Sequence, residues 1–133
     1  GGHTMSDLGA AQLKEAAMEG YFATVDRKAL DAVLGMFVPD ATLCVQTTNQ
    51  TYEGRDSGIR GMFEGFFEAY ASVSHDDIEI VVDPSRQRVA AQFVAVRTTP
   101  DGGEERASNC NFFHFADGKI AHMWIYMSDD ISL

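Results

Sequence analysis

Residues 106–115 (RASNCNFFHF) and residues 119–128 (KIAHMWIYMS) are two strand-like runs separated by the turn signal Asp117-Gly118. Asp-Gly between such runs is a strong signal for a tight turn that joins antiparallel strands. The stretch therefore predicts a long β-hairpin. Because successive residues of a strand point to opposite faces, each run contributes one row of side chains to each face of a sheet.

The two faces of this hairpin differ in composition. We assign one row of each strand to the interior: Asn109, Asn111, Phe113, Met123, Ile125 and Met127. The opposite row contains Phe112, Trp124 and Tyr126, with His114 and His122 on the same side. Three exposed aromatic side chains form a larger apolar patch than a monomer usually leaves bare. We therefore expect a homodimer that forms through the outer face of the sheet.

The rest of the chain has helical periodicity first and strand patterns afterwards. Apolar residues recur at intervals of three and four in three segments. Residues 75–83 and 88–99 read as long strands, and residues 41–46 and 51–54 read as short ones. The helical stripes are Met18, Tyr21, Phe22 and Val25, then Leu30, Val33, Leu34 and Phe37, and then Ile59, Met62, Phe63, Phe66, Phe67 and Tyr70. Helices followed by antiparallel strands predict an α+β fold.

Length and charge limit the possible functions. The chain has 133 residues, 45% of them hydrophobic, which suits one domain with one core. We interpret residues 1–5 (GGHTM) as a tag remnant and residues 6–133 as a single domain. A net charge of −10 disfavours nucleic acid and anionic membrane surfaces as partners. No apolar run is long enough to span a bilayer and no secretion signal is visible, so we expect a cytoplasmic protein.

The cysteines and histidines show no metal-binding pattern. Cys44 and Cys110 lack any CxxC or Cys/His ligand spacing. Nucleotide-binding loops, Ser/His/Asp sets and haem signatures are also missing from the sequence. We therefore expect neither a metal nor a cofactor.

The order of the elements resembles a known superfamily. Three N-terminal helices, two short strands and four long ones, with PDAT (39–42) and FADGKIAHMW (115–124), are similar to nuclear transport factor 2-like proteins. These include ketosteroid isomerases, SnoaL-like polyketide cyclases, scytalone dehydratase-type lyases and limonene epoxide hydrolases. The resemblance implies three helices packed in the concave face of a strongly curved, mostly antiparallel sheet. In this cone-shaped α+β barrel an apolar pocket opens at one end. Such motifs predict the fold and leave the chemistry open.

The resemblance to ketosteroid isomerases places the oxyanion-hole tyrosine of that family on Tyr21, its second oxyanion-hole acid on Asn111 and its general-base aspartate on Val45. Valine cannot accept the proton next to a carbonyl. The sequence therefore predicts no ketosteroid isomerase activity. A tyrosine hydroxyl and an amide remain, and such donors can stabilise an oxyanion or orient a carbonyl group.

The resemblance to dehydratases of the bile-acid and scytalone type implies a different set: Tyr21, Asp26 and His75. Elimination of water needs a base and an acid, and one histidine can serve as both if a tyrosine holds the carbonyl oxygen. Asp26 would orient the imidazole. Residues five apart on a helix are about 140° apart, so this hypothesis places Asp26 beyond the end of the first helix.

Each of these residues also has a structural interpretation. Tyr21 can be a core aromatic residue, Asp26 can cap the second helix, and His75 can be a solvated residue at the start of a strand. The predicted pocket has these further lining residues: Phe22, Phe37, Val45, Phe63, Phe67, Asn109, Phe113, Met123, Ile125 and Met127.

Three classes of function fit the sequence. The first is a small acid-base enzyme, a lyase or isomerase-like, that acts on an apolar ring-containing molecule. The second is a SnoaL-like cyclase or hydrolase, although that branch often carries Asp or His where this chain has Ile125. The third is a non-catalytic ligand-binding or dimerisation module. A histidine or carboxylate that points into the cavity would favour an enzyme.

Overall fold

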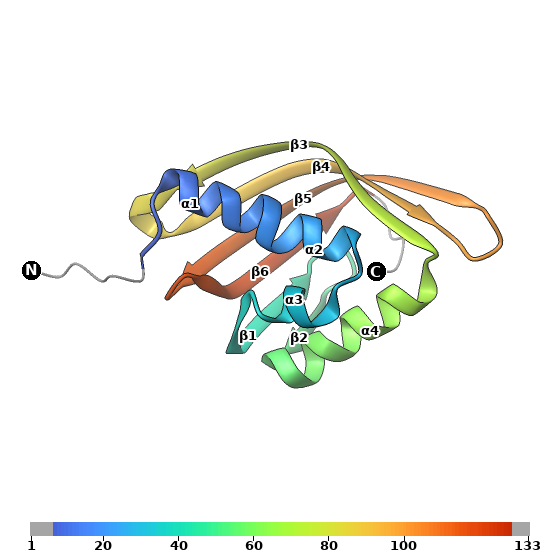
Figure 1. The fold of residues 1–133 in the computed structure, drawn as a ribbon, viewed down its shortest axis with the longest axis horizontal. Coiled ribbons are helices and arrows are strands. Elements are labelled where there is room, and N and C mark those ends of the chain that lie inside the picture. The colour runs from blue at the N-terminus through green and yellow to red at the C-terminus, as the bar shows by residue number, and fades with distance from the viewer. Residues whose placement is uncertain (1–6, 129–133) are drawn as a thin grey trace, which may run out of the picture.

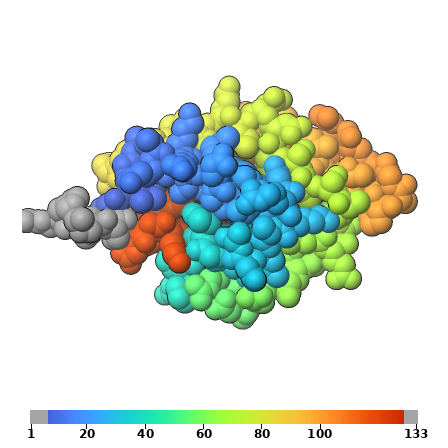
Figure 2. All heavy atoms as spheres, in the orientation of Figure 1, coloured from blue at the N-terminus to red at the C-terminus, as the bar shows by residue number. Residues whose placement is uncertain are grey.

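A layer of helices covers one face of a curved β-sheet in this protein (Figure 1). The computed structural model describes residues 7–128. The predicted tag remnant, residues 1–5, lies outside the described residues. In the space-filling view of the same side, the helical segments cover the middle of the sheet (Figure 2). Within residues 7–128, no helix combines the length and the apolar character needed to cross a bilayer.

The first helix runs without a break from Ala10 to Asp26. It comprises α1 (Ala10–Glu15), a π-helical stretch η1 (Ala16–Phe22) and α2 (Ala23–Asp26). The side chains that it buries against the sheet are Leu13, Ala17, Tyr21, Phe22 and Val25. The chain then turns at Lys28, which has a φ of 55°. The Nζ atom of Lys28 donates hydrogen bonds to the carbonyl oxygens of Phe67, at 2.9 Å, and Tyr70.

Two more helices complete the layer in the described part of the chain. The second is α3 (Leu30–Leu34), and the third joins η2 (Gly54–Ile59) to α4 (Arg60–Ala69). The three predicted helices are therefore confirmed. Lys28 binds the carbonyl groups at the end of α4, where a cation is favoured by the helix dipole.

Phe37 is not helical, which corrects the sequence prediction. The second helix ends at Leu34, and Phe37 is the first residue of strand β1. Pro39 follows closely in the sequence, and the residue before a proline is forced toward extended conformations. The spacing of Phe37 from Leu30 matched a helix by coincidence. Its ring is nevertheless completely buried in the core.

Six strands form one sheet in the order β2-β1-β6-β5-β4-β3. All neighbours pair antiparallel except β1 and β6, which are parallel. The sheet is mostly antiparallel, as predicted, and it stays open because β2 and β3 form its two edges. The strands are β1 (Phe37–Val45), β2 (Gln50–Glu53), β3 (Ser72–Asp83), β4 (Arg88–Thr98), β5 (Glu104–Ala116) and β6 (Lys119–Met127).

The hairpin of β5 and β6 has the predicted turn and the predicted faces. Ala116 pairs with Lys119, and the two residues between them, Asp117 and Gly118, have φ values of 53° and 77°. Positive φ at both positions is typical of the turn that suits twisted antiparallel strands. The row assigned to the interior is buried, whereas Phe112 and Tyr126 are 44% and 46% exposed on the outer face.

Strand β3 contains a β-bulge that determines where His75 points. Asp76 pairs with Val94 and Glu79 pairs with Gln92, so that Asp77 and one more residue lie opposite a single residue of β4. Asp77 has a φ of 54°. The extra residue reverses the alternation. As a result His75, which would otherwise face outward, shares the inner face with the partly buried Ile78, Ile80 and Val82.

The left-handed backbone at Asp77 predicts an unusual order of stabilities. Asp77→Gly should be more stable than Asp77→Val by about 1–2 kcal/mol, because a β-branched residue is strained at positive φ and glycine is not. Glu79, which lies in regular strand two residues away, should show the reverse order for the same two substitutions. Urea unfolding of the four variants measures this. If glycine and valine gave the same order of stabilities at positions 77 and 79, this would argue against the bulge.

We propose that the outer face of β5 and β6 forms a homodimer. Phe112 and Tyr126 lie side by side there, with ring centroids 6.1 Å apart, next to Trp124. Trp124→Glu and Tyr126→Glu should each weaken self-association at least tenfold by placing a charge in an apolar contact. Val81→Glu should leave self-association unchanged, because the exposed Val81 lies on edge strand β3, which β4 separates from the hairpin of β5 and β6. Sedimentation that shows a monomeric unmutated protein at micromolar concentration would disprove the proposal.

Candidate active site

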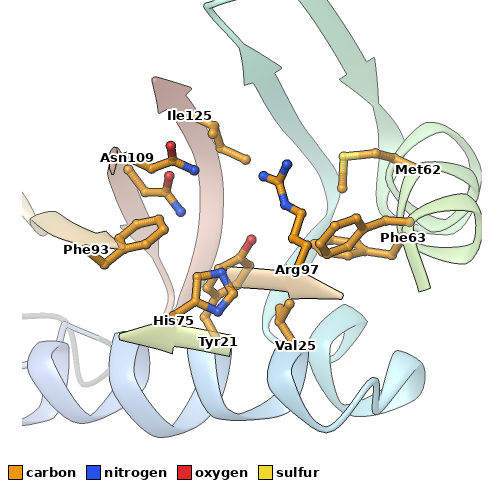
Figure 3. Close-up of a pocket in the computed structure, with 11 residues that line it drawn as sticks. Tyr21, Val25, Met62, Phe63, His75, Phe93, Arg97, Asn109 and Ile125 are labelled. Carbon is orange, nitrogen blue, oxygen red and sulfur yellow. The ribbon is translucent and has the colours of Figure 1, made fainter. Parts of the chain in front are cut away.

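A cavity lies between the helices and the inner face of the sheet (Figure 3). The space among its lining residues is about 390 Å³ when its mouth is included, and about 20 Å³ can hold the centre of a water-sized sphere. This is room for about one water molecule, so a larger ligand requires flexible side chains such as Met62 to move. The lining residues are Tyr21, Val25, Met62, Phe63, Phe66, His75, Phe93, Arg97, Asn109, Asn111 and Ile125.

His75 and Asp26 form a hydrogen-bonded pair at the wall of this cavity. The distance from His75 Nδ1 to Asp26 Oδ1 is 2.5 Å, and the backbone N–H of His75 donates to Asp26 Oδ2 at 3.2 Å. The His75 side chain is 9% exposed and that of Asp26 is 30% exposed. Both oxygens of Asp26 therefore hold one residue of β3.

The structure excludes the capping role that was considered for Asp26. Ala29 occupies the N-cap position of α3, and no side chain caps that helix. Asp26 is also the last residue of α2 and does not lie beyond the helix end. The angle of about 140° from Tyr21 remains compatible with the pair, because Tyr21 lines the cavity while Asp26 binds His75 from the flank of the helix.

The pair fixes the orientation and the tautomer of the imidazole. A carboxylate at Nδ1 is an acceptor, so it favours the tautomer that carries its proton on Nδ1. The lone pair then lies on Nε2, the nitrogen that Asp26 does not engage. The rings of Phe22 and Phe93 hold the imidazole, each with its centroid 5.0 Å from that of His75. The imidazole of His75 thus has a fixed orientation in an apolar environment.

Tyr21 places a hydroxyl group among aromatic rings. Its own ring contacts four others, and its hydroxyl points into the cavity (Figure 3). Burial, and to a smaller extent the charge of Asp26, raise the pKa of Tyr21 far above its ordinary value. The hydroxyl therefore keeps its proton at neutral pH and can donate a hydrogen bond.

Asn109 and Asn111 bring two amide groups to the same space. They are adjacent on the inner row of β5 and are 5% and 2% exposed. Within residues 7–128, neither side-chain oxygen has a hydrogen-bond partner. A buried polar group without a partner costs about 1–3 kcal/mol. Such groups at a cavity wall are typical of a site that completes its hydrogen bonds with a ligand.

Arg97 lines the cavity, and sequence reasoning did not identify it. The residue is buried on β4, and its guanidinium lies 5.7 Å from the ring centroids of both Phe66 and Tyr70. One of its nitrogens is 3.7 Å from Met127 Sδ. The sequence does indicate that Arg97 faces inward. In the segment 88–99 it falls in the same alternating row as the apolar Val89, Ala91, Phe93 and Ala95.

The predicted site residues occupy different places around the cavity. Six of them line it: Tyr21, Phe63, His75, Asn109, Asn111 and Ile125. Five others contact residues of the lining: Asp26 and Phe22 contact His75, Phe37 and Phe113 contact Tyr21, and Met127 contacts Arg97. Val45, Phe67 and Met123 are not among the lining residues, and five lining residues were not predicted: Val25, Met62, Phe66, Phe93 and Arg97. No group of three or more potential ligands for a metal ion occurs in residues 7–128.

Solved structures share this fold at low sequence identity. A candidate polyketide cyclase from Xanthomonas campestris pv. campestris superposes with a TM-score of 0.75 at 19% identity, covering 86% of this chain and 90% of that chain. A candidate SnoaL-like polyketide cyclase from Shewanella putrefaciens has a TM-score of 0.76 at 11% identity, with 87% and 89% covered. A protein of ketosteroid isomerase-like fold from Catenulispora acidiphila, in complex with trimethylamine, has a TM-score of 0.72 at 14% identity, with 82% of each chain covered.

Sequence comparison gives a family assignment as well. No curated protein matches the chain. The model of the SnoaL-like domain matches residues 18–123, a range that runs from the first helix into β6 and contains most of the cavity lining. The chain belongs to the SnoaL-like domain family.

Proposed function

We propose that this protein is an acid-base enzyme, a lyase or an isomerase-like enzyme, that acts on an apolar ring-containing small molecule. The observation that carries the proposal is the 2.5 Å contact between His75 Nδ1 and Asp26 Oδ1 at the wall of an apolar cavity. A ligand-binding module needs no oriented base. A histidine held in this way favours an enzyme over a passive binder.

The proposed reaction begins with removal of a proton from the carbon next to a carbonyl group. Nε2 of His75 accepts the proton, and the electron pair of the C–H bond moves toward the carbonyl oxygen to form an enolate. Tyr21 donates a hydrogen bond to that oxygen, whose growing charge strengthens the bond. Asp26 stabilises the imidazolium that results, in the manner of a carboxylate-histidine pair.

The second step determines the class of product. In a lyase, the enolate electrons form a C=C bond and expel a hydroxyl group from the next carbon. That hydroxyl takes the proton from Nε2 and leaves as water, which restores neutral His75. In an isomerase, Nε2 returns the proton to another carbon. The same base serves both reactions.

An intramolecular aldol cyclisation is the second candidate, and membership in the SnoaL-like family is compatible with it. It would start from the same enolate, but the enolate carbon would attack a second carbonyl group in the substrate, and the alkoxide that forms would take the proton back from Nε2 of His75. The two candidates differ in their products, because a lyase releases water and a conjugated ketone whereas a cyclase forms a new carbon-carbon bond.

His75→Gln should reduce proton abstraction about 10²- to 10⁴-fold, the usual contribution of a general base. The substrate is unidentified, so the direct measurement is exchange of the α-hydrogens of cyclic ketones in D₂O, followed by NMR. Conversion of cyclic β-hydroxyketones to conjugated ketones can be followed by absorbance. Tyr21→Phe should also reduce both rates, and Asp26→Asn should reduce them less than His75→Gln.

The matched control is His114→Gln, since His114 lies on the outer row of β5. It should leave the rates unchanged. Thermal unfolding of all four variants separates lost chemistry from lost folding. If His75→Gln and Asp26→Asn both fold normally and exchange α-hydrogens at the rate of the unmutated protein, the pair is structural and the proposal fails.

Steroid isomerisation should be undetectable for the unmutated protein. Val45, buried in β1, stands where ketosteroid isomerases carry their base. Val45→Asp is the single change most able to create some activity, because it places a carboxylate next to Ile125 of the cavity wall. Val45→Asn, which cannot accept the proton, is the control. Ready turnover of a standard unsaturated ketosteroid by the unmutated chain would contradict this prediction.

A further inference from the structure

The cavity lining contains three polar residues that the proposed reaction does not use: Arg97, Asn109 and Asn111. Arg97 comes from β4 and the two asparagines come from β5, whereas the reacting groups come from the first helix and β3. In Figure 3 the side chains of Arg97 and Asn109 extend into the same space as the Tyr21 hydroxyl. The cavity therefore has a cation and two amide groups besides the groups of the proposed reaction.

Arg97 is held in place at the cavity wall by several neighbours. The rings of Phe66 and Tyr70 each lie 5.7 Å from its guanidinium carbon. The Tyr70 hydroxyl donates to Glu105 Oε1 at 2.9 Å and accepts a hydrogen bond from Arg97. A guanidinium fixed by rings and a hydroxyl group loses little freedom when it binds a ligand.

A buried cation at position 97 lowers the stability of the fold, and an apolar side chain there would not. Arg97 is 2% exposed, and removal of a charge from water is expensive even when the charge has hydrogen-bond partners. The inner row of β4 otherwise holds small and apolar residues that pack without this cost. Because Arg97 lines the cavity, its positive charge also acts on any ligand that enters there.

We infer that the ligand of this cavity carries a carboxylate group, which Arg97 binds at the cavity wall. A planar guanidinium matches the two oxygens of a carboxylate. A single guanidinium at the cavity wall suits a monoanion better than a doubly charged phosphate. The inference deepens the proposed function and rests on it only for the reacting carbon, which would lie toward His75. The buried oxygens of Asn109 and Asn111 then accept hydrogen bonds from hydroxyl groups of the same ligand.

The net charge of the protein makes this inference testable with a simple pair of ligands. Benzoate and benzamide have nearly the same shape and differ in charge. A chain with a charge of −10 repels benzoate at long range. A preference for benzoate must therefore come from a local cation in the site.

NMR titration of the unmutated protein should show benzoate binding at least tenfold more tightly than benzamide. Arg97→Gln should abolish this preference, and Arg97→Lys should retain part of it, because lysine keeps the charge and loses the planar fork. Arg60→Gln is the matched control. Arg60 lies on α4 near Asp56, half-exposed and away from the cavity lining, so this variant should keep the full preference. Thermal unfolding verifies that each variant is folded.

Equal binding of the two ligands, no binding of either at millimolar concentration, or a preference that persists in a folded Arg97→Gln variant would each overturn the inference. His75→Gln separates this result from the proposed reaction. It should keep the preference for benzoate while losing α-hydrogen exchange. A protein that prefers benzoate but exchanges no α-hydrogens would retain the carboxylate site and refute the acid-base proposal.

Discussion

The hydrogen bond between Asp26 and His75 joins two segments that are 49 residues apart in the sequence, and the geometry of the site depends on it. It requires the first helix to end where Asp26 can reach the edge strand β3, and it requires β3 to turn His75 inward. The first condition is met at Lys28, whose positive φ ends the helix and whose side chain binds the end of α4. The second is met by the bulge at Asp77. The helix end and the bulge thus converge on one imidazole.

Much of the fold follows from local patterns in the sequence. Alternating apolar positions mark one row of β5 and one row of β6 as the inner face. For this reason the inner positions of Asn109, Asn111 and Ile125 could be assigned from parity alone. The turn at Asp117-Gly118 does not fix the pairing along the whole hairpin, because the register shifts between His114 and Phe115. Tyr21 could be placed in the same way, because the helical repeat puts it on the buried stripe.

Other parts of the site could not be predicted, because single residues override the patterns there. The alternation of Ile78, Ile80 and Val82 places His75 on the outer face unless one residue is inserted, and nothing in the segment 75–83 marks Asp77 as that residue. Phe37 continues the helical spacing, yet the chain extends before Pro39. Arg97 could not be predicted for a different reason. Its position in the alternation of the strand indicates the inner face, but a charged residue near the end of an apolar run is more typical of the point where a strand leaves the core. Only the position of the cavity shows that it lines a site.

The identity of residue 26 follows from the two donors that it binds. Its Oδ1 atom faces Nδ1 of His75 and its Oδ2 atom accepts the backbone N–H of the same residue, whereas an asparagine has one acceptor oxygen and would turn an N–H group toward one of these donors. Two hydrogen bonds to a charged acceptor offset the unfavourable place of a negative charge at the C-terminal end of the first helix. The same carboxylate would also stabilise an imidazolium, so a proton that His75 takes from a ligand in the proposed reaction would not weaken the contact that positions the ring.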